Sequence, residues 1–195
     1  MTRNSAIAHE EEPDVMNSRN DLHLQELCIR ASEGRMEAIG EIYDLAAGDI
    51  FGLALWRTGN EHDAEDVVQE TFIRMTMAFR RKVFPASPRA WIMTIAHRVA
   101  IDITRRRRTR RETSLDHALL LPVAEHRLEA AGETAGLSRL LSELSPKVRE
   151  AFFLRYLTGF TFAEIGRITG IPTFSAASRC RLAMKRVRQL LEVTS

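Results

Sequence analysis

Residues 87–111 read SPRAWIMTIAHRVAIDITRRRRTRR, and this stretch decides how the chain is organised. Ser87 followed by Pro88 provides an N-cap and a proline at the first helical position, so a helix is predicted to begin here. Apolar residues recur at a spacing of three and four, which predicts a buried face made of Ile92, Ile95, Ala96, Val99 and Ile103. The opposite face is predicted to point outward and carries Thr94, His97, Arg98, Ile101, Arg105 and Arg108.

The end of this stretch is almost pure arginine. Six of the seven residues from Arg105 to Arg111 are arginine, and Thr109 is the only interruption. A guanidinium group can bond two phosphate oxygens and keeps its charge, so this density favours a phosphate-rich partner. A solvated basic helix end, which the helix dipole also favours, is the plainer alternative.

Length and composition describe a globular protein with one ordinary domain or two small ones. The chain has 195 residues, of which 45% are hydrophobic and 28% charged, and its formal net charge is only +2, so its basic character is local. The sequence contains no run of about 20 apolar residues, so no membrane-spanning helix is predicted. The N-terminus is not typical of a secretory signal. Cys28 and Cys180 are far apart and predict neither a disulfide framework nor a zinc site. We therefore expect a cytoplasmic protein without a metal or cofactor.

Three helices are predicted before residue 87. Residues 1–20 are polar and without a period, which predicts a flexible tail. Helices are expected from Leu22 to Gly34 and from Met36 to Trp56, and Asn60 is placed to cap a third. The third helix has an apolar side and a polar side, and the polar side carries Asp66, Gln69, Glu70 and Arg74.

A basic loop, residues 80–86, joins the third helix to residues 87–111. It contains Arg80, Arg81 and Lys82, followed by Phe84 and Pro85. Basic residues beside an aromatic ring can bind a single nucleic-acid strand, the cations holding phosphates and the ring stacking on a base. Equally, Phe84 can close the hydrophobic core, and the residues alone leave both interpretations open.

Residues 112–136 divide the chain. They hold five acidic residues against one basic residue and are interrupted by Pro122, Gly132 and Gly136, which predicts a linker. The predicted domains are therefore residues 21–111 and 137–193.

The second domain has the pattern of a helix-turn-helix. Ser145 and Pro146 repeat the start seen at residue 87, and Thr161 with Glu164 fits a capping box for a short helix that Gly170 ends. The final helix is predicted to enter the major groove of DNA with Thr173, Ser175, Ala177, Ser178, Arg179, Arg181 and Lys185. A plain three-helix bundle with a basic exterior is the alternative.

Three segments, in this order, resemble bacterial sigma factors of the extracytoplasmic-function (ECF) group. They are DAEDVVQETFIRM (63–75), PRAWIMTIAHRVAIDITRRRR (88–108) and LSPKVREAFFLRYLTGFTFAEIGRITGIP (144–172). The resemblance covers about residues 22–191. It implies an all-α fold of two small helical domains, sigma region two and sigma region four, joined by a flexible linker.

The resemblance also implies partners and contacts. It implies a subunit that binds core RNA polymerase, through the β′ clamp and the β flap, and directs transcription initiation at promoter DNA, often under an anti-sigma factor. The implied clamp contacts are Asp66, Gln69, Glu70 and Arg74. The implied contacts to the −10 element are Arg80, Arg81, Lys82, Phe84, Thr94, His97, Arg98, Arg105, Arg106 and Arg108. The final helix is implied to read the −35 element.

The sequence departs from the family pattern at a few of these positions. Arg98 stands where members commonly carry Asn, and Phe174 stands where they commonly carry Gly. Cys180 and Leu182 replace a larger apolar residue and an often basic one.

Two other functions are compatible with parts of the sequence. In a free-standing helix-turn-helix regulator, residues 22–108 would sense a ligand or dimerise. A DNA-processing enzyme would need a nucleophile or metal-binding carboxylates, and no P-loop, zinc pattern or serine motif is present. No catalytic residue is therefore predicted.

Overall fold

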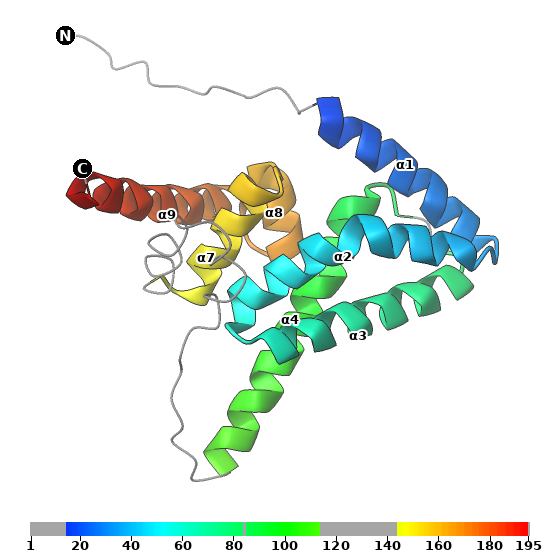
Figure 1. Ribbon diagram of the computed structural model, residues 1–195, viewed down its shortest axis with the longest axis horizontal. Helices are drawn as coiled ribbons and strands as arrows, with labels where there is room; N and C mark the ends of the chain where they lie inside the picture. The colour runs from blue at the N-terminus through cyan, green and yellow to red at the C-terminus, as the bar shows by residue number, and fades with distance from the viewer. Residues whose placement is uncertain (1–14, 84, 114–143, 195) are drawn as a thin grey trace.

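The computed structural model is all-α, as predicted, and describes residues 15–83, 85–113 and 144–194 (Figure 1). The N-terminal module contains α1 (Val15–Ser32), α2 (Glu37–Thr58), α3 (Glu61–Arg80) and α4 (Pro88–Thr113). The C-terminal module contains α7 (Pro146–Phe152), the π-helix η1 (Phe153–Leu157), α8 (Phe162–Thr169) and α9 (Thr173–Thr194). Within these ranges no helix has the length and apolar character needed to cross a membrane.

Capping residues set the helix ends as the sequence predicts. Asn60 Oδ1 accepts a hydrogen bond from the backbone N–H of Asp63 at 2.8 Å, which caps α3. Thr161 and Glu164 form the predicted capping box at the start of α8, and Gly170 ends that helix at φ 69°, where a side chain is disfavoured. Helices α4 and α7 begin at the predicted prolines, but the Ser145 side chain makes no capping hydrogen bond, so the proline alone marks the start of α7. Local signals therefore determine where these elements begin and end.

Helix α1 is longer than the sequence predicts. It begins at Val15, so residues 15–20 are helical where a flexible tail was expected. Its buried residues Leu24, Leu27, Cys28 and Ala31 lie further along, and extending an anchored helix costs much less than starting one. Most of the predicted linker, residues 114–136, and Phe84 lie outside the described residues.

The two modules share one hydrophobic core. Phe153 and Leu154 of η1 and Ile165 of α8 belong to the same buried cluster as Leu53 of α2 and Ala96 of α4. Figure 1 shows α7 and α8 lying beside α2 and α4, and contacts join α7 to α2 and α8 to α4. Helix α2 is apolar around most of its circumference, so it needs a second cover besides α1, α3 and α4. The C-terminal module supplies that cover.

The two modules pack tightly against each other at Gly52. A Cβ atom added there would lie 2.5 Å from Cζ of Phe153, whereas one added at Gly48, a turn earlier in α2, would meet nothing within 4 Å. The absence of a side chain at residue 52 therefore lets the Phe153 ring rest on the backbone of α2.

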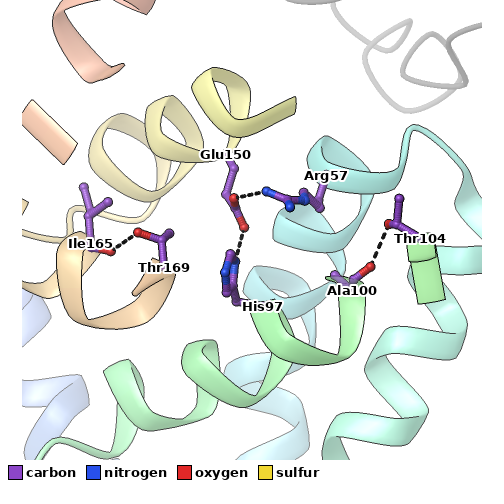
Figure 2. A network of polar contacts seen from close by, with 7 residues as sticks. All are labelled: Arg57, His97, Ala100, Thr104, Glu150, Ile165 and Thr169. Carbon is purple, nitrogen blue, oxygen red and sulfur yellow. Dashed lines mark hydrogen bonds and ion pairs between the residues drawn. The ribbon is translucent and has the colours of Figure 1, made fainter. Parts of the chain in front are cut away.

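A polar cluster crosses the same boundary (Figure 2). The Glu150 side chain of α7 is fully buried, and its two oxygens lie 2.7 Å from Arg57 Nη1 and 2.5 Å from His97 Nδ1. Arg57 lies in the last turn of α2 and His97 lies in the middle of α4, so one carboxylate of the C-terminal module joins two helices of the N-terminal module.

A second polar contact lies at the start of α4. The guanidinium of Arg89 lies 3.2 Å from Asp49 of α2, donates to the backbone carbonyl of Thr158, and lies over the Phe160 ring, 4.4 Å from its centroid. Arg89 therefore also joins the two modules.

Replacing Gly52 with alanine is expected to weaken the docking of the modules without unfolding α2. The new methyl group overlaps the Phe153 ring, an overpacking that costs about 1–3 kcal/mol, while alanine favours the helix itself by up to about 1 kcal/mol. Small-angle scattering should show a larger radius of gyration for Gly52→Ala at unchanged helix content. Gly48→Ala is the matched control and should remain as compact as the wild type; an equally compact Gly52→Ala chain would contradict the prediction.

Replacing Glu150 with alanine is expected to lower the free energy of unfolding by about 3–5 kcal/mol, because Arg57, whose side chain is only 14% exposed, is left without its partner. Urea denaturation measures this directly. Glu41→Ala is the control: Glu41 also pairs with an arginine, Arg30, at 3.1 Å, but its side chain is 45% exposed. Its loss should cost no more than about 1 kcal/mol. Similar losses for the two variants would show that the buried cluster adds no particular stability.

Candidate nucleic-acid interface

The outer face of α4 presents free arginines. Arg98, Arg105 and Arg106 are exposed, and none of them forms an ion pair with a described residue. Arg107 differs, because its Nη1 lies 2.5 Å from Asp63 Oδ2 of α3. The side chain of Arg108 is outside the described part of the chain. The arginine run thus contains both a structural arginine and arginines available to phosphate.

His97 is not on this face. Its side chain is buried, with 5% of the residue exposed, and it is bonded to Glu150. The prediction that His97 points outward is therefore wrong, and in this arrangement it cannot reach a DNA strand. Thr94 is half-buried, and its hydroxyl donates to the Ala90 carbonyl at 2.7 Å. Periodicity within α4 indicated one buried face, but docking of the C-terminal module buries a second.

The corner between α3 and α4 exposes the predicted basic loop. Arg80, Arg81 and Lys82 are all exposed. Lys82 has φ 57°, in the left-handed backbone region that few residues other than glycine adopt. Its N–H donates to the Phe79 carbonyl at 2.8 Å. Helix α3 therefore ends in a tight turn that groups three cations beside the start of α4.

Part of the polar side of α3 is also exposed to solvent. Asp66 and Gln69 are exposed and Glu70 is half-buried. Arg74 instead binds within the protein, with Nε 2.8 Å from Glu70 and Nη1 3.4 Å from Asp102 of α4. The hydrogen bond that Arg74 donates to Glu70 raises the pKa of Arg74 against the lowering effect of burial. Arg74 therefore positions Glu70, and Asp66 and Gln69 are the freer groups.

A cleft of about 490 Å³ lies between the acidic start of α3 and the basic half of α4. It is lined by Asn60, His62, Asp63, Asp66, Ile103, Arg106 and Arg107. Acidic and basic surfaces thus meet at this cleft, with the Arg107–Asp63 ion pair at their boundary.

Helix α9 is buried on one side and basic on the other. Ala176, Cys180 and Ala183 are buried, whereas Thr173, Ser178, Arg181 and Lys185 are exposed. Ser175, Ala177 and Arg179 are half-buried. Residues 173–189 contain no acidic residue. The predicted groove-facing residues therefore mostly fall on one accessible, positively charged surface.

The turn between α8 and α9 is held by close backbone packing. A Cβ atom added at Gly166 would lie 2.8 Å from the Ile171 carbonyl oxygen, so a side chain there would push α9 away from α8. This close approach fixes the angle at which α9 leaves the turn.

Sequence reasoning missed the accessibility of Phe174 as a site feature. It lies in the first turn of α9 and is 73% exposed. Sequence periodicity alone did not indicate this exposure.

The cysteines are structural. Burial raises the pKa of both thiols, Cys28 and Cys180, to about 11, and Cys180 Sγ donates to the Ala151 carbonyl at 3.3 Å. Among the described residues there is also no group of three His, Cys, Asp or Glu side chains placed to hold a metal ion.

Comparisons with known proteins agree with this geometry. Residues 42–111 match Sigma-70 region 2, and residues 135–187 match Sigma-70, region 4. The ECF RNA polymerase sigma factor BldN of Streptomyces coelicolor is 29% identical over 156 residues, which cover 75% of this chain and 58% of BldN. The ferric citrate uptake sigma factor FecI of Escherichia coli is 33% identical over 117 residues, covering 58% of this chain and 67% of FecI. The chain thus spans less than two thirds of BldN.

A solved structure shows the same fold. The sigma factor RpoE of Bartonella quintana, in complex with the anti-sigma factor NepR, superposes with a TM-score of 0.69 at 24% identity, covering 80% of this chain and 98% of RpoE. Both halves of the chain, in their order and with their helix-turn-helix, therefore have sigma-factor counterparts. The chain belongs to the sigma-70 family, within its group of ECF sigma factors.

Proposed function

We propose that this protein binds core RNA polymerase and directs it to promoters whose −10 and −35 elements it recognises. The observation that carries the proposal is the separation of three accessible surfaces on one chain. These are the polar side of α3, the cations of the α3–α4 corner and of α4, and the basic side of α9. The chemistry of RNA synthesis belongs to the polymerase, and this chain supplies binding and position.

The polar side of α3 is the proposed polymerase contact. Asp66 and Gln69 extend from a helix whose other side is fully buried, so they are held on a rigid element. Glu70 is oriented by Arg74. A negatively charged, rigid patch is suited to a basic partner surface, because complementary charge fixes orientation and speeds association.

The α3–α4 corner and α4 are the proposed −10 reader. Exposed guanidinium groups at Arg98, Arg105 and Arg106 can hold a phosphate backbone, and the three cations of the corner extend that surface. A surface that binds an unstacked strand favours duplex opening, since capturing a base outside the helix offsets the cost of unpairing it.

The basic side of α9 is the proposed −35 reader. Serine and arginine side chains there can bond to base edges and phosphates in the major groove. A small helical unit binds DNA weakly at physiological salt. Attachment of two such readers to one polymerase raises the effective concentration of each at its element.

We also propose control by an anti-sigma factor. RpoE of Bartonella quintana, which shares this fold, forms a complex with the anti-sigma factor NepR. The exposed surfaces of α3 and α9 are available to an inhibitor of the same kind. A free-standing helix-turn-helix regulator is not favoured, because residues 42–111, which would sense a ligand or dimerise in such a protein, match Sigma-70 region 2.

The direct test is run-off transcription with purified protein and core polymerase on promoters with randomised −10 and −35 elements. Initiation at a defined pair of motifs is expected. Failure to bind core polymerase, together with tight binding of the isolated chain to a duplex operator, would support the regulator instead.

Reversal of charge at Asp66 is expected to weaken binding to core polymerase by about tenfold or more, because an exposed attractive charge becomes a repulsive one. Fluorescence anisotropy of labelled Asp66→Arg protein with core polymerase measures the effect. Glu65→Arg is the matched control: it makes the same charge change at an exposed neighbour on the same helix, about 100° around its axis. Equal losses for both variants would indicate long-range electrostatics and not a contact at Asp66.

Removal of both Arg105 and Arg106 is expected to reduce the salt dependence of promoter binding. Each lost phosphate contact lowers the slope of log affinity against log salt by about 0.7–0.9, so the double alanine variant should lose about 1.5. Arg107→Ala is the contrast, since its guanidinium is bonded to Asp63. It should reduce thermal stability and leave the slope nearly unchanged. An unaltered slope for the double variant would exclude these arginines as phosphate contacts.

A further inference from the structure

Phe174 is the most exposed of the large hydrophobic side chains in the described ranges. It is 73% exposed, although the core of the C-terminal module lies a short distance away and takes up Ala176 and Cys180 of the same helix. An exposed phenylalanine gives up the stabilisation that burial would provide. Its position therefore calls for an explanation in terms of a partner.

The position of Phe174 on α9 indicates which surface it belongs to. Ser178, Arg181 and Lys185 follow it at intervals of four, seven and eleven residues, so all four side chains lie along one side of the helix. Phe174 lies in the first turn, and the first residues of a recognition helix are the ones that reach base edges. The cations follow further along, where they can contact phosphates.

The charge around Phe174 favours DNA over a protein partner. Residues 173–189 carry five basic residues and no acidic one. The core of a protein–protein interface is usually depleted of charged residues other than arginine, whereas the exposed side of α9 that follows Phe174 is consistently basic, as a DNA-binding surface requires. An apolar side chain in the major groove has one specific partner, the C5-methyl group of thymine.

We propose that Phe174 is a specificity-determining residue that contacts the methyl group of a thymine in the −35 element. The inference rests on the proposed function, since it assigns a base preference to the helix proposed to read that element. The aromatic ring excludes water from the methyl group, and no hydrogen bond is needed. Selectivity at this base pair therefore comes from apolar contact, while Ser178 and Arg181 bond to neighbouring groups.

The test uses the full chain bound to core polymerase and a −35 duplex obtained by selection from randomised promoters. Each thymine of the selected element is replaced in turn by deoxyuridine, which lacks only the methyl group. For the wild-type protein, one replacement should weaken binding about fourfold, the effect of one buried methyl group. Phe174→Ala should bind the thymine and deoxyuridine duplexes equally, and Phe174→Leu should retain part of the difference.

Arg181→Ala is the matched control on the same side of α9. It should weaken binding to every duplex and leave the fourfold ratio between thymine and deoxyuridine unchanged. Circular dichroism should show unchanged helicity for Phe174→Ala, because the side chain is exposed and alanine favours helix.

Several results would overturn the inference. The selected element could contain no thymine, or the wild-type protein could bind every deoxyuridine duplex as tightly as the thymine duplex. The Phe174→Ala variant could also keep the fourfold ratio of affinities between the thymine and deoxyuridine duplexes. Loss of an inhibitor protein's binding with unchanged DNA recognition would show that Phe174 is a protein contact instead. In each of these cases the polymerase complex still binds its promoter. If it binds no promoter at all, the proposed function itself fails.

Discussion

The carboxylate of Glu150 lies between Arg57 and His97 with none of its side chain exposed to solvent. Burying a charge is unfavourable unless partners replace the lost water, and both carboxylate oxygens find such partners in the opposite module. The interaction is directional, so it fixes how α7 sits on α2 and α4 in a way that apolar packing alone would not. The orientation of α8 and α9 follows, and with it the direction in which the basic side of α9 faces.

The arginines of α3 and α4 serve two different purposes. Arg107 and Arg74 are bonded to Asp63, Glu70 and Asp102 and tie α3 to α4. Arg105 and Arg106, in the same run as Arg107, remain in solvent. The ion pair of Arg107 with Asp63 holds the two helices together. The free cations of α4 and the polar side of α3 therefore keep a fixed position relative to each other.

Much of this arrangement could be predicted from the sequence, because its causes are local. Asn60, Pro88, Pro146 and the pair Thr161 and Glu164 mark helix starts through hydrogen bonds or backbone restrictions within a few residues. The exposure of Asp66 and Arg105 follows from helical periodicity. His97 could not be placed in this way, because its burial depends on Glu150, 53 residues further along the chain. The role of Gly52 likewise depends on Phe153 and has no local signature.

The contact between Gly52 and Phe153 also bears on how the protein is made. At ribosomal rates of about 5–20 residues per second, roughly 5–20 s pass between synthesis of the two residues. Until Phe153 follows, the outer side of α2 lacks its cover, and transiently exposed apolar surface of this kind makes a folding chain prone to aggregation. Slow translation across the later half of the message would lengthen this exposure and favour aggregation.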